Sequence, residues 1–245
     1  MLSASDMPVP HDGDHDSTAT DVLLLPAWQL ISGVTPALVP ELIANHVNSA
    51  PTNTTPLPPA PTSAIAATLS DAATTISDAA ATLSDTAASI IPAIAPILPS
   101  PHSPLSAKPC PHSYLILLCS QKTRDARCGQ SAPLLRRELE RHLRPLGLYR
   151  DLHDERPGGC GIYFISHVGG HKYAANVMVF RRSGSSGTQG ETALGGQSAQ
   201  GIWLGRVRPE DCENIVKYTV LQGKVVKPES QLRGGYDRTR GLTSW

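Results

Sequence analysis

Aromatic residues are scarce in this chain of 245 residues: they make up 4% of it, against 22 prolines and 20 glycines. Such a composition argues against one hydrophobic core that extends over the whole length. Basic residues are absent before Lys108. Residues 1–107 contain nine acidic residues and no basic ones, a formal charge of −9, whereas the remaining 21 basic and 12 acidic residues give +9. The chain therefore joins two physically different segments. Basic runs interleaved with aromatics, as single-strand nucleic-acid binders need, are missing, so no nucleic-acid partner is expected.

Long apolar runs are also missing. No run approaches the roughly 18 residues that a transmembrane helix needs, so we expect no membrane span. The sequence MLSASDMPVPHDGDHD has neither the basic and apolar regions of a secretory signal nor the Arg-rich character of a mitochondrial presequence. These features predict an intracellular protein and favour the cytosol. In such a reducing compartment, five cysteines are expected to bind metal or react more often than to form disulfides.

Composition divides the chain into four parts. Residues 1–48 form an acidic segment whose first 20 residues are expected to be disordered; its apolar part, 21–48, either docks on the later domain or is the remnant of a first layer. Residues 49–112 form a linker rich in Ala, Pro, Ser and Thr, and a heptad-like repeat within it lacks the charge pairs of a coiled coil. The principal domain is expected over 113–227, and residues 228–245 are expected to be a polar tail.

Residues 113–227 alternate between strand-like and helix-like patterns. Strands are predicted at SYLILLCS, CGIYFISHV, ANVMVFRR and GIWLGRV. One helix is predicted to begin with Ser131 as its cap and Pro133 in its first turn, and a second to run from Pro209 to about Gly223. The order β-α-β-β-β-α predicts an α/β fold with a thioredoxin-like layer.

Four side chains able to bind metal lie near the ends of predicted strands. They are Cys119, Cys128, His167 and His171. The carboxyl ends of strands gather functional groups in open α/β sheets, so the two pairs are expected to converge. Two thiolates and two imidazoles suit zinc or an iron–sulfur cluster, and the residues alone leave both open. A thioredoxin-like thiol enzyme without metal is a third reading, although no C-x-x-C is present. No carboxylate pair is placed for glycoside hydrolysis.

Three motifs carry a resemblance to a known family. CSQKTRDARCG, HVGGHKYAANV and GIWLGRVRPED resemble the sucrase/ferredoxin-like family of thioredoxin-like ferredoxins, which includes the actin-patch-distal and altered-inheritance-of-mitochondria proteins of fungi. The resemblance covers about residues 113–245. It implies a [2Fe–2S] cluster held by Cys119, Cys128, His167 and His171. The chain would then be an electron carrier or redox sensor, not a stand-alone enzyme, and its compartment the mitochondrion. Ala175 replaces a glycine of the family pattern.

Such ligation has consequences for redox chemistry and partners. Neutral histidine ligands leave the oxidised cluster without net charge, which raises its reduction potential relative to four-cysteine ligation. Arg124, Arg127 and Lys172 would favour the reduced form further; alternatively they are solvated, with local ion pairs such as Arg124 with Asp125. The electron donor and acceptor are not indicated. The C-terminal Trp245 resembles the signal by which iron–sulfur proteins recruit their assembly machinery.

Overall fold

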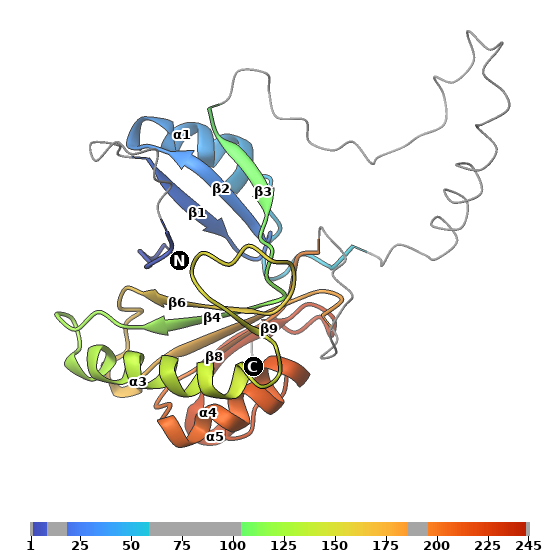
Figure 1. Cartoon of the computed structure of the whole chain (residues 1–245). Coiled ribbons are helices and arrows are strands. Elements are labelled where there is room, and N and C mark those ends of the chain that lie inside the picture. Colours follow the sequence, from blue (N-terminus) through green and yellow to red (C-terminus); the bar gives the residue numbers. More distant parts are fainter. Residues whose placement is uncertain (1, 9–18, 59–103, 186–195, 244–245) are drawn as a thin grey trace, which may run out of the picture. The chain divides into compact units, whose positions relative to one another are not determined.

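The computed structural model describes residues 2–8, 19–58, 104–185 and 196–243 (Figure 1). These residues form a mixed α/β structure with two sheets, as the sequence predicts. The heptad-like repeat and Trp245 lie outside the described residues. Within the described part of the chain, no helix is both long and apolar enough to cross a membrane.

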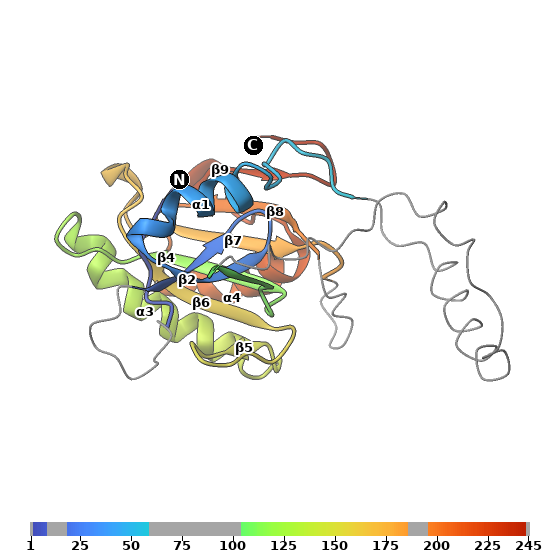
Figure 2. The ribbon, with the colours of Figure 1, turned by 90° about the horizontal axis from the view of Figure 1, so that it is seen from above.

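The larger sheet has six strands in the order β5-β6-β4-β7-β8-β9, and Figure 2 shows the strands side by side in this order. Its strands are β4 (Tyr114–Cys119), β5 (Tyr149–Arg150), β6 (Cys160–Ile165), β7 (Val177–Arg182), β8 (Ser198–Leu204) and β9 (Leu232–Asp237). The central strand β4 pairs in parallel with β6 and antiparallel with β7. The predicted order β-α-β-β-β-α is thus present, and the carboxyl ends of β4 and β6 meet at one edge.

Helices cover one face of this sheet (Figure 1). They are α3 (Ala126–Leu143) and a continuous helical segment made of η4 (Pro209–Asp211), α4 (Cys212–Asn214) and η5 (Ile215–Val220). Leu135, Leu139 and Leu143 of α3 are at most 1% exposed and pack with Ile116 and Leu118 of β4. Each fully buried leucine contributes about 2–3 kcal/mol to stability, so this layer fixes α3 against the sheet.

A second, three-stranded sheet has the order β1-β2-β3. It consists of β1 (Thr20–Leu24), β2 (Gln29–Val34) and β3 (Ser106–Pro109), and β2 is followed by η1 (Pro36–Leu38), α1 (Val39–Leu42) and η2 (Ile43–Val47). Trp28, between β1 and β2, packs with Leu115 and Tyr163 and donates a hydrogen bond from Nε1 to the His112 carbonyl. Because Leu115 alternates with Ile116 along β4, this contact lies on the sheet face opposite the helices. The first apolar segment therefore docks on the later domain.

The structure differs from the sequence predictions at four segments. Part of the N-terminal stretch that is expected to be disordered contacts β6: Ser5 forms a bridge with Ile165, and the Asp6 N–H donates to the Phe164 carbonyl. Helix α3 begins at Ala126. Its cap is Asp125, six residues before the predicted cap Ser131, and Pro133 lies inside the helix. The expected linker contributes β3, which pairs with β2. The expected polar tail contains α5 (Pro228–Gln231) and the sheet strand β9. Except at α3, whose start is set by the local cap Asp125, pairing with a distant segment stabilises residues whose local pattern is weak.

Candidate metal centre

The two cysteines of the C-x8-C motif meet because β4 leads directly into the turn before α3. Cys119 is the last residue of β4, and Cys128 lies in the first turn of α3. Their exposures are 2% and 0%. The predicted helix, with Ser131 as its cap, left Cys128 in the loop before it. Because α3 begins at Ala126, Cys128 lies in the helix instead. Both sulfur atoms therefore lie under the turn that joins β4 to α3.

The pairing of β4 with β6 brings the first histidine to the cysteines. Cys119 is opposite Ile165, the last residue of β6, so His167 follows two residues beyond the paired position. Its Nδ1 lies 3.5 Å from Sγ of Cys119. Ligand atoms of Cys119, Cys128 and His167 all lie within 4.8 Å of one another. The structure thus brings together three of the four predicted ligands.

The second histidine reaches the same place through a glycine turn. Gly169 and Gly170 have φ angles of +82° and +69°, a conformation that residues with a Cβ seldom adopt. The turn returns His171 to His167, and the two rings stack with centroids 4.9 Å apart. The His171 side chain is 64% exposed. His171 therefore lies beside the three converged donors but on their solvent side.

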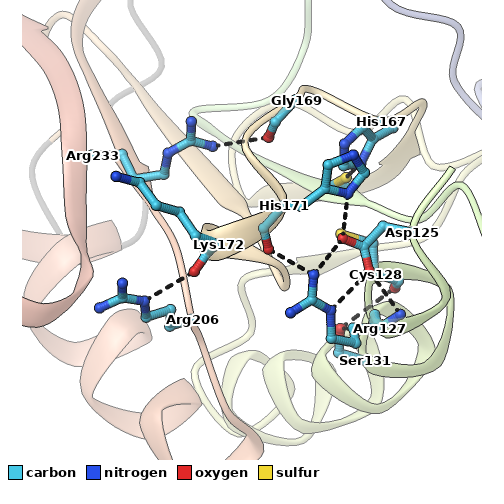
Figure 3. A network of polar contacts seen from close by, with 11 residues as sticks. Asp125, Arg127, Cys128, Ser131, His167, Gly169, His171, Lys172, Arg206 and Arg233 are labelled. Atoms are coloured by element: carbon cyan, nitrogen blue, oxygen red, sulfur yellow. Dashed lines mark hydrogen bonds and ion pairs between the residues drawn. The ribbon is translucent and has the colours of Figure 1, made fainter.

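Asp125 organises the rim of the site (Figure 3). Its carboxylate accepts hydrogen bonds from the backbone N–H of Arg127 (3.0 Å) and from the Arg127 guanidinium (3.0 and 3.1 Å). Its Oδ2 also lies 2.9 Å from Nδ1 of His171. Hydrogen bonds from Arg127, and then from His171, hold the pKa of this carboxyl well below its usual range. The contact occupies Nδ1 of His171 and leaves Nε2 as the nitrogen available to a metal.

Arg233 supports the glycine turn from β9. Its Nη1 donates to Oδ1 of Asn176 (2.5 Å) and to the Gly169 carbonyl (3.4 Å), a contact drawn in Figure 3. Its guanidinium lies over the rings of Trp203 (4.2 Å) and Tyr173 (4.4 Å). A Cβ on Gly170 would lie 2.7 Å from the Arg233 Nη2 atom, so the turn and the arginine are closely packed. Sequence reasoning did not identify this residue, which lies in the segment interpreted as a tail.

The donor atoms fit a cation that stabilises thiolates. Burial raises the pKa of Cys119 to about 12, and burial lowers the pKa of His167. The neutral Cys119 thiol and the neutral His167 imidazole are therefore the forms favoured at pH 7 without a metal, and a bound metal would ionise the thiol. His167 Nε2 is buried and, within the described part of the chain, has no hydrogen-bond partner. An unpartnered buried nitrogen, on a ring whose Nδ1 lies 3.5 Å from the Cys119 sulfur, fits a metal or cluster.

The remaining cysteines do not join this site. Cys110, Cys160 and Cys212 are buried and free of disulfides. Burial raises the pKa of Cys110 to about 11 and that of Cys212 to about 12, so the helix start does not activate the Cys212 thiol. All three lie in hydrophobic clusters. They are packing residues.

The arrangement can now be compared with known proteins. The family model described as sucrase/ferredoxin-like matches residues 1–234. The chain belongs to the sucrase/ferredoxin-like family. This confirms the resemblance carried by the three motifs, and extends it through the N-terminal sheet that the motifs did not include.

Curated relatives each match a little under half of the chain. Actin patches distal protein 1 of Saccharomyces cerevisiae is 38% identical over 113 residues, 46% of this chain and 31% of the relative. Altered inheritance of mitochondria protein 32 of Clavispora lusitaniae is 34% identical over 116 residues, 47% of this chain and 33% of the relative. The protein of the same name from Debaryomyces hansenii is 35% identical over 113 residues, 46% of this chain and 33% of the relative. The matched part is thus about a third of each relative. No solved structure matches the chain.

Proposed function

We propose that this sucrase/ferredoxin-like protein binds a [2Fe–2S] cluster through Cys119, Cys128, His167 and His171 and acts as an electron carrier or redox sensor. The observation that carries the proposal is the convergence of three ligand atoms within 4.8 Å, with the ring of His171 stacked beside them. The ferredoxin in the family's description supports an iron–sulfur group over other metals. The cluster would supply one-electron redox chemistry.

The chain's own residues would set the properties of such a centre. Cys119 and Cys128 supply two negative charges, and neutral His167 and His171 supply none, so the oxidised centre has no net charge. A four-cysteine centre would carry two more negative charges, and adding an electron to it would cost more. Asp125 holds His171 in one orientation, and Arg233 holds the turn that carries both histidines. The ligand set thus favours a higher reduction potential than four cysteines would give.

A structural zinc ion is the second candidate, because three donors within 4.8 Å surround a point that one ion could occupy. Zinc would then connect β4, α3 and the glycine turn without redox chemistry. A metal-free thiol enzyme is less well supported, since the raised pKa of Cys119 makes its thiol a poor nucleophile.

Metal and sulfide analysis separates these candidates. The protein is purified anaerobically as wild type, as His167→Ala/His171→Ala and as His153→Ala, the control at an exposed histidine outside the site. We expect visible absorbance that dithionite bleaches, with about two iron and two sulfide per chain in wild type and control. The double variant should lose the absorbance or show it shifted. A colourless wild-type protein with one zinc per chain would establish the structural zinc site instead. A colourless wild-type protein without metal would leave the metal-free thiol enzyme as the remaining candidate.

For the compartment, we propose the mitochondrion, since several relatives bear the name altered inheritance of mitochondria protein 32. The cytosol is the alternative. Fractionation of cells that express the tagged full-length protein would decide between them. Recruitment of iron–sulfur assembly machinery through Trp245 is a further part of the proposal, and unchanged cluster loading after deletion of Trp245 would exclude it.

A further inference from the structure

The four proposed ligands differ sharply in exposure. Cys119 and Cys128 are at most 2% exposed, and His167 is partly buried. The side chain of His171 is 64% exposed. If the proposed cluster is present, on which this inference rests, the His171 ring is its most exposed ligand. An electron that enters or leaves the centre by the shortest route then passes the surface around His171.

Several basic residues lie near this exposed ligand, and Figure 3 draws Arg127, Lys172 and Arg206 among them. Arg127 donates from Nη2 to the His171 carbonyl at 2.8 Å, and its side chain is 62% exposed. Lys172 is the next residue, and Arg206 donates from Nε to the Lys172 carbonyl at 3.1 Å. Arg124 is exposed in the turn before α3, and its charge acts on His167. We call these four residues, Arg124, Arg127, Lys172 and Arg206, the basic rim.

Among the described residues, a carboxylate neutralises Arg127 of the basic rim but none of its other three members. Asp125 is its single acidic neighbour among the ion pairs of the described residues; its side chain is 4% exposed and is already engaged by Arg127 and His171. Arg124, Lys172 and Arg206 form no ion pair with any described carboxylate. Arg124 therefore does not pair with Asp125, contrary to one sequence interpretation.

Further along α3 the arrangement is the opposite. Arg136 and Arg144 pair with Glu140, and Arg141 pairs with Glu138. Apart from Arg137, the arginines further along α3 are thus ion-paired, whereas Arg124, Lys172 and Arg206 of the basic rim are exposed and have no ion pair among the described residues. Uncompensated charge of one sign around an exposed reactive group steers partners of the opposite charge to it.

We propose that the basic rim docks a redox protein whose surface around its own cofactor is acidic. Complementary charge raises the rate of encounter and orients the partner, and it does so without a large apolar interface. Docking places the partner's cofactor next to the His171 ring. One electron then passes between the two centres; one is oxidised and the other reduced, and no bond is formed or broken.

Small redox reagents of opposite charge test this without the partner. The dithionite-reduced holoprotein, freed of excess reductant, is mixed with ferricyanide, an anion, or with tris(1,10-phenanthroline)cobalt(III), a cation. The rate of reoxidation is followed by the visible absorbance at increasing ionic strength. In wild type, ferricyanide should react fast at low salt and slow down as salt is added, because screening removes the attraction.

Charge reversal in the rim should invert this preference. In Arg124→Glu/Lys172→Glu we expect the ferricyanide rate at low salt to fall about tenfold and the cobalt rate to rise, with both converging on wild type at high salt. The matched control is Lys217→Glu/Lys224→Glu. Lys224 follows Gly223, which packs on Arg181 and Gln200 at the end of β7 and β8 away from the site. Arg124→Glu alone, which changes no residue beside a ligand, should show a smaller effect in the same direction.

Three results would overturn the proposal. The first is an equal rate of reoxidation by ferricyanide in the rim variant and in wild type. The second is a loss of this rate in the control variant that equals the loss in the rim variant. The third is a slower reoxidation by ferricyanide in the presence of a thymidine oligonucleotide than in the presence of polyglutamate of equal charge. That result would identify the basic rim as a nucleic-acid surface. A colourless protein is a different failure, because it removes the proposed cluster itself. An unchanged visible spectrum in the variants would show that the ligands are intact. Reversed charge near the centre also lowers its midpoint potential, which would speed reoxidation by both reagents, so opposite changes in the two rates report surface charge.

Discussion

Asp125 Oδ2 lies 2.9 Å from Nδ1 of His171, while Oδ1 of the same carboxylate accepts the Arg127 N–H at the start of α3. One side chain therefore caps the helix that carries Cys128 and orients the histidine that completes the proposed ligand set. The position of one cysteine and the orientation of one histidine are coupled through it. This coupling explains how an exposed histidine is held next to a buried pair of thiols.

Replacing Asp125 separates its two roles. Asn remains a good helix cap but is a weaker acceptor for the histidine N–H, whereas Ala removes both interactions. Loss of such a partner to a metal-bound histidine typically lowers metal affinity 10- to 100-fold. We expect Asp125→Asn to lose iron 10- to 100-fold more readily to a chelator, and Asp125→Ala to lose it more readily still. Iron retention of wild type in Asp125→Asn would show that the contact does not hold the ligand.

Arg233 should matter for stability as well as for the site. Its substitution by Ala removes two cation–π contacts and the hydrogen bonds to Asn176 and Gly169, which we expect to cost about 2 kcal/mol of unfolding free energy. Lys should restore little of this, because it lacks the planar group that stacks on Trp203 and Tyr173. Urea unfolding followed by tryptophan fluorescence measures the change.

Arg240→Ala is the matched control for Arg233. Arg240 is exposed, and its ion pair with Asp237 is long, with Nε and Oδ2 3.7 Å apart. Its substitution should change the unfolding free energy by less than about 0.5 kcal/mol. Equal stability of Arg233→Ala and Arg240→Ala would contradict a supporting role for Arg233.

Much of the site's framework could be predicted from local pattern. Buried strand runs end at Cys119 and just before His167, and parallel pairing of those strands brings the residues together. The start of α3 was predicted too late because Pro133 favours a first turn, whereas Asp125 forms the actual cap. Arg233 could not be predicted, since β9 follows the site by some 60 residues and its pattern LRGGYD lacks strand-like alternation. Pairing with β8, a non-local interaction, defines that strand.

Pro133 offers a test of the corrected helix. It is exposed and is the eighth residue of α3, where it cannot donate the hydrogen bond that a helical residue makes to the carbonyl four positions earlier. Pro133→Ala should restore that bond and raise the unfolding free energy by about 1–3 kcal/mol. Had the helix begun at Ser131, proline would suit its first turn and the substitution would bring no gain. Thermal and urea unfolding of the metal-free proteins decide between the two.

His112 makes stability depend on pH. It is 3% exposed, its Nε2 lies 3.2 Å from the Tyr163 hydroxyl, and burial lowers its pKa from 6.5 to about 4. The unfolded chain therefore binds a proton at a pH where the folded chain does not, and stability falls as pH decreases from about 6.5 to 4. The full difference corresponds to about 3 kcal/mol.

His112→Asn isolates this contribution, because Asn has no group that titrates in the window. The variant is expected to be less stable at pH 7, since a buried ring is lost, but its unfolding free energy should decline less between pH 6.5 and 4 than that of wild type. The measurement is urea unfolding at half-unit pH intervals. Carboxylates contribute equally to both proteins, so the difference between the two curves reports His112 alone. Parallel curves would mean that His112 is protonated in the folded state and that burial does not control its charge.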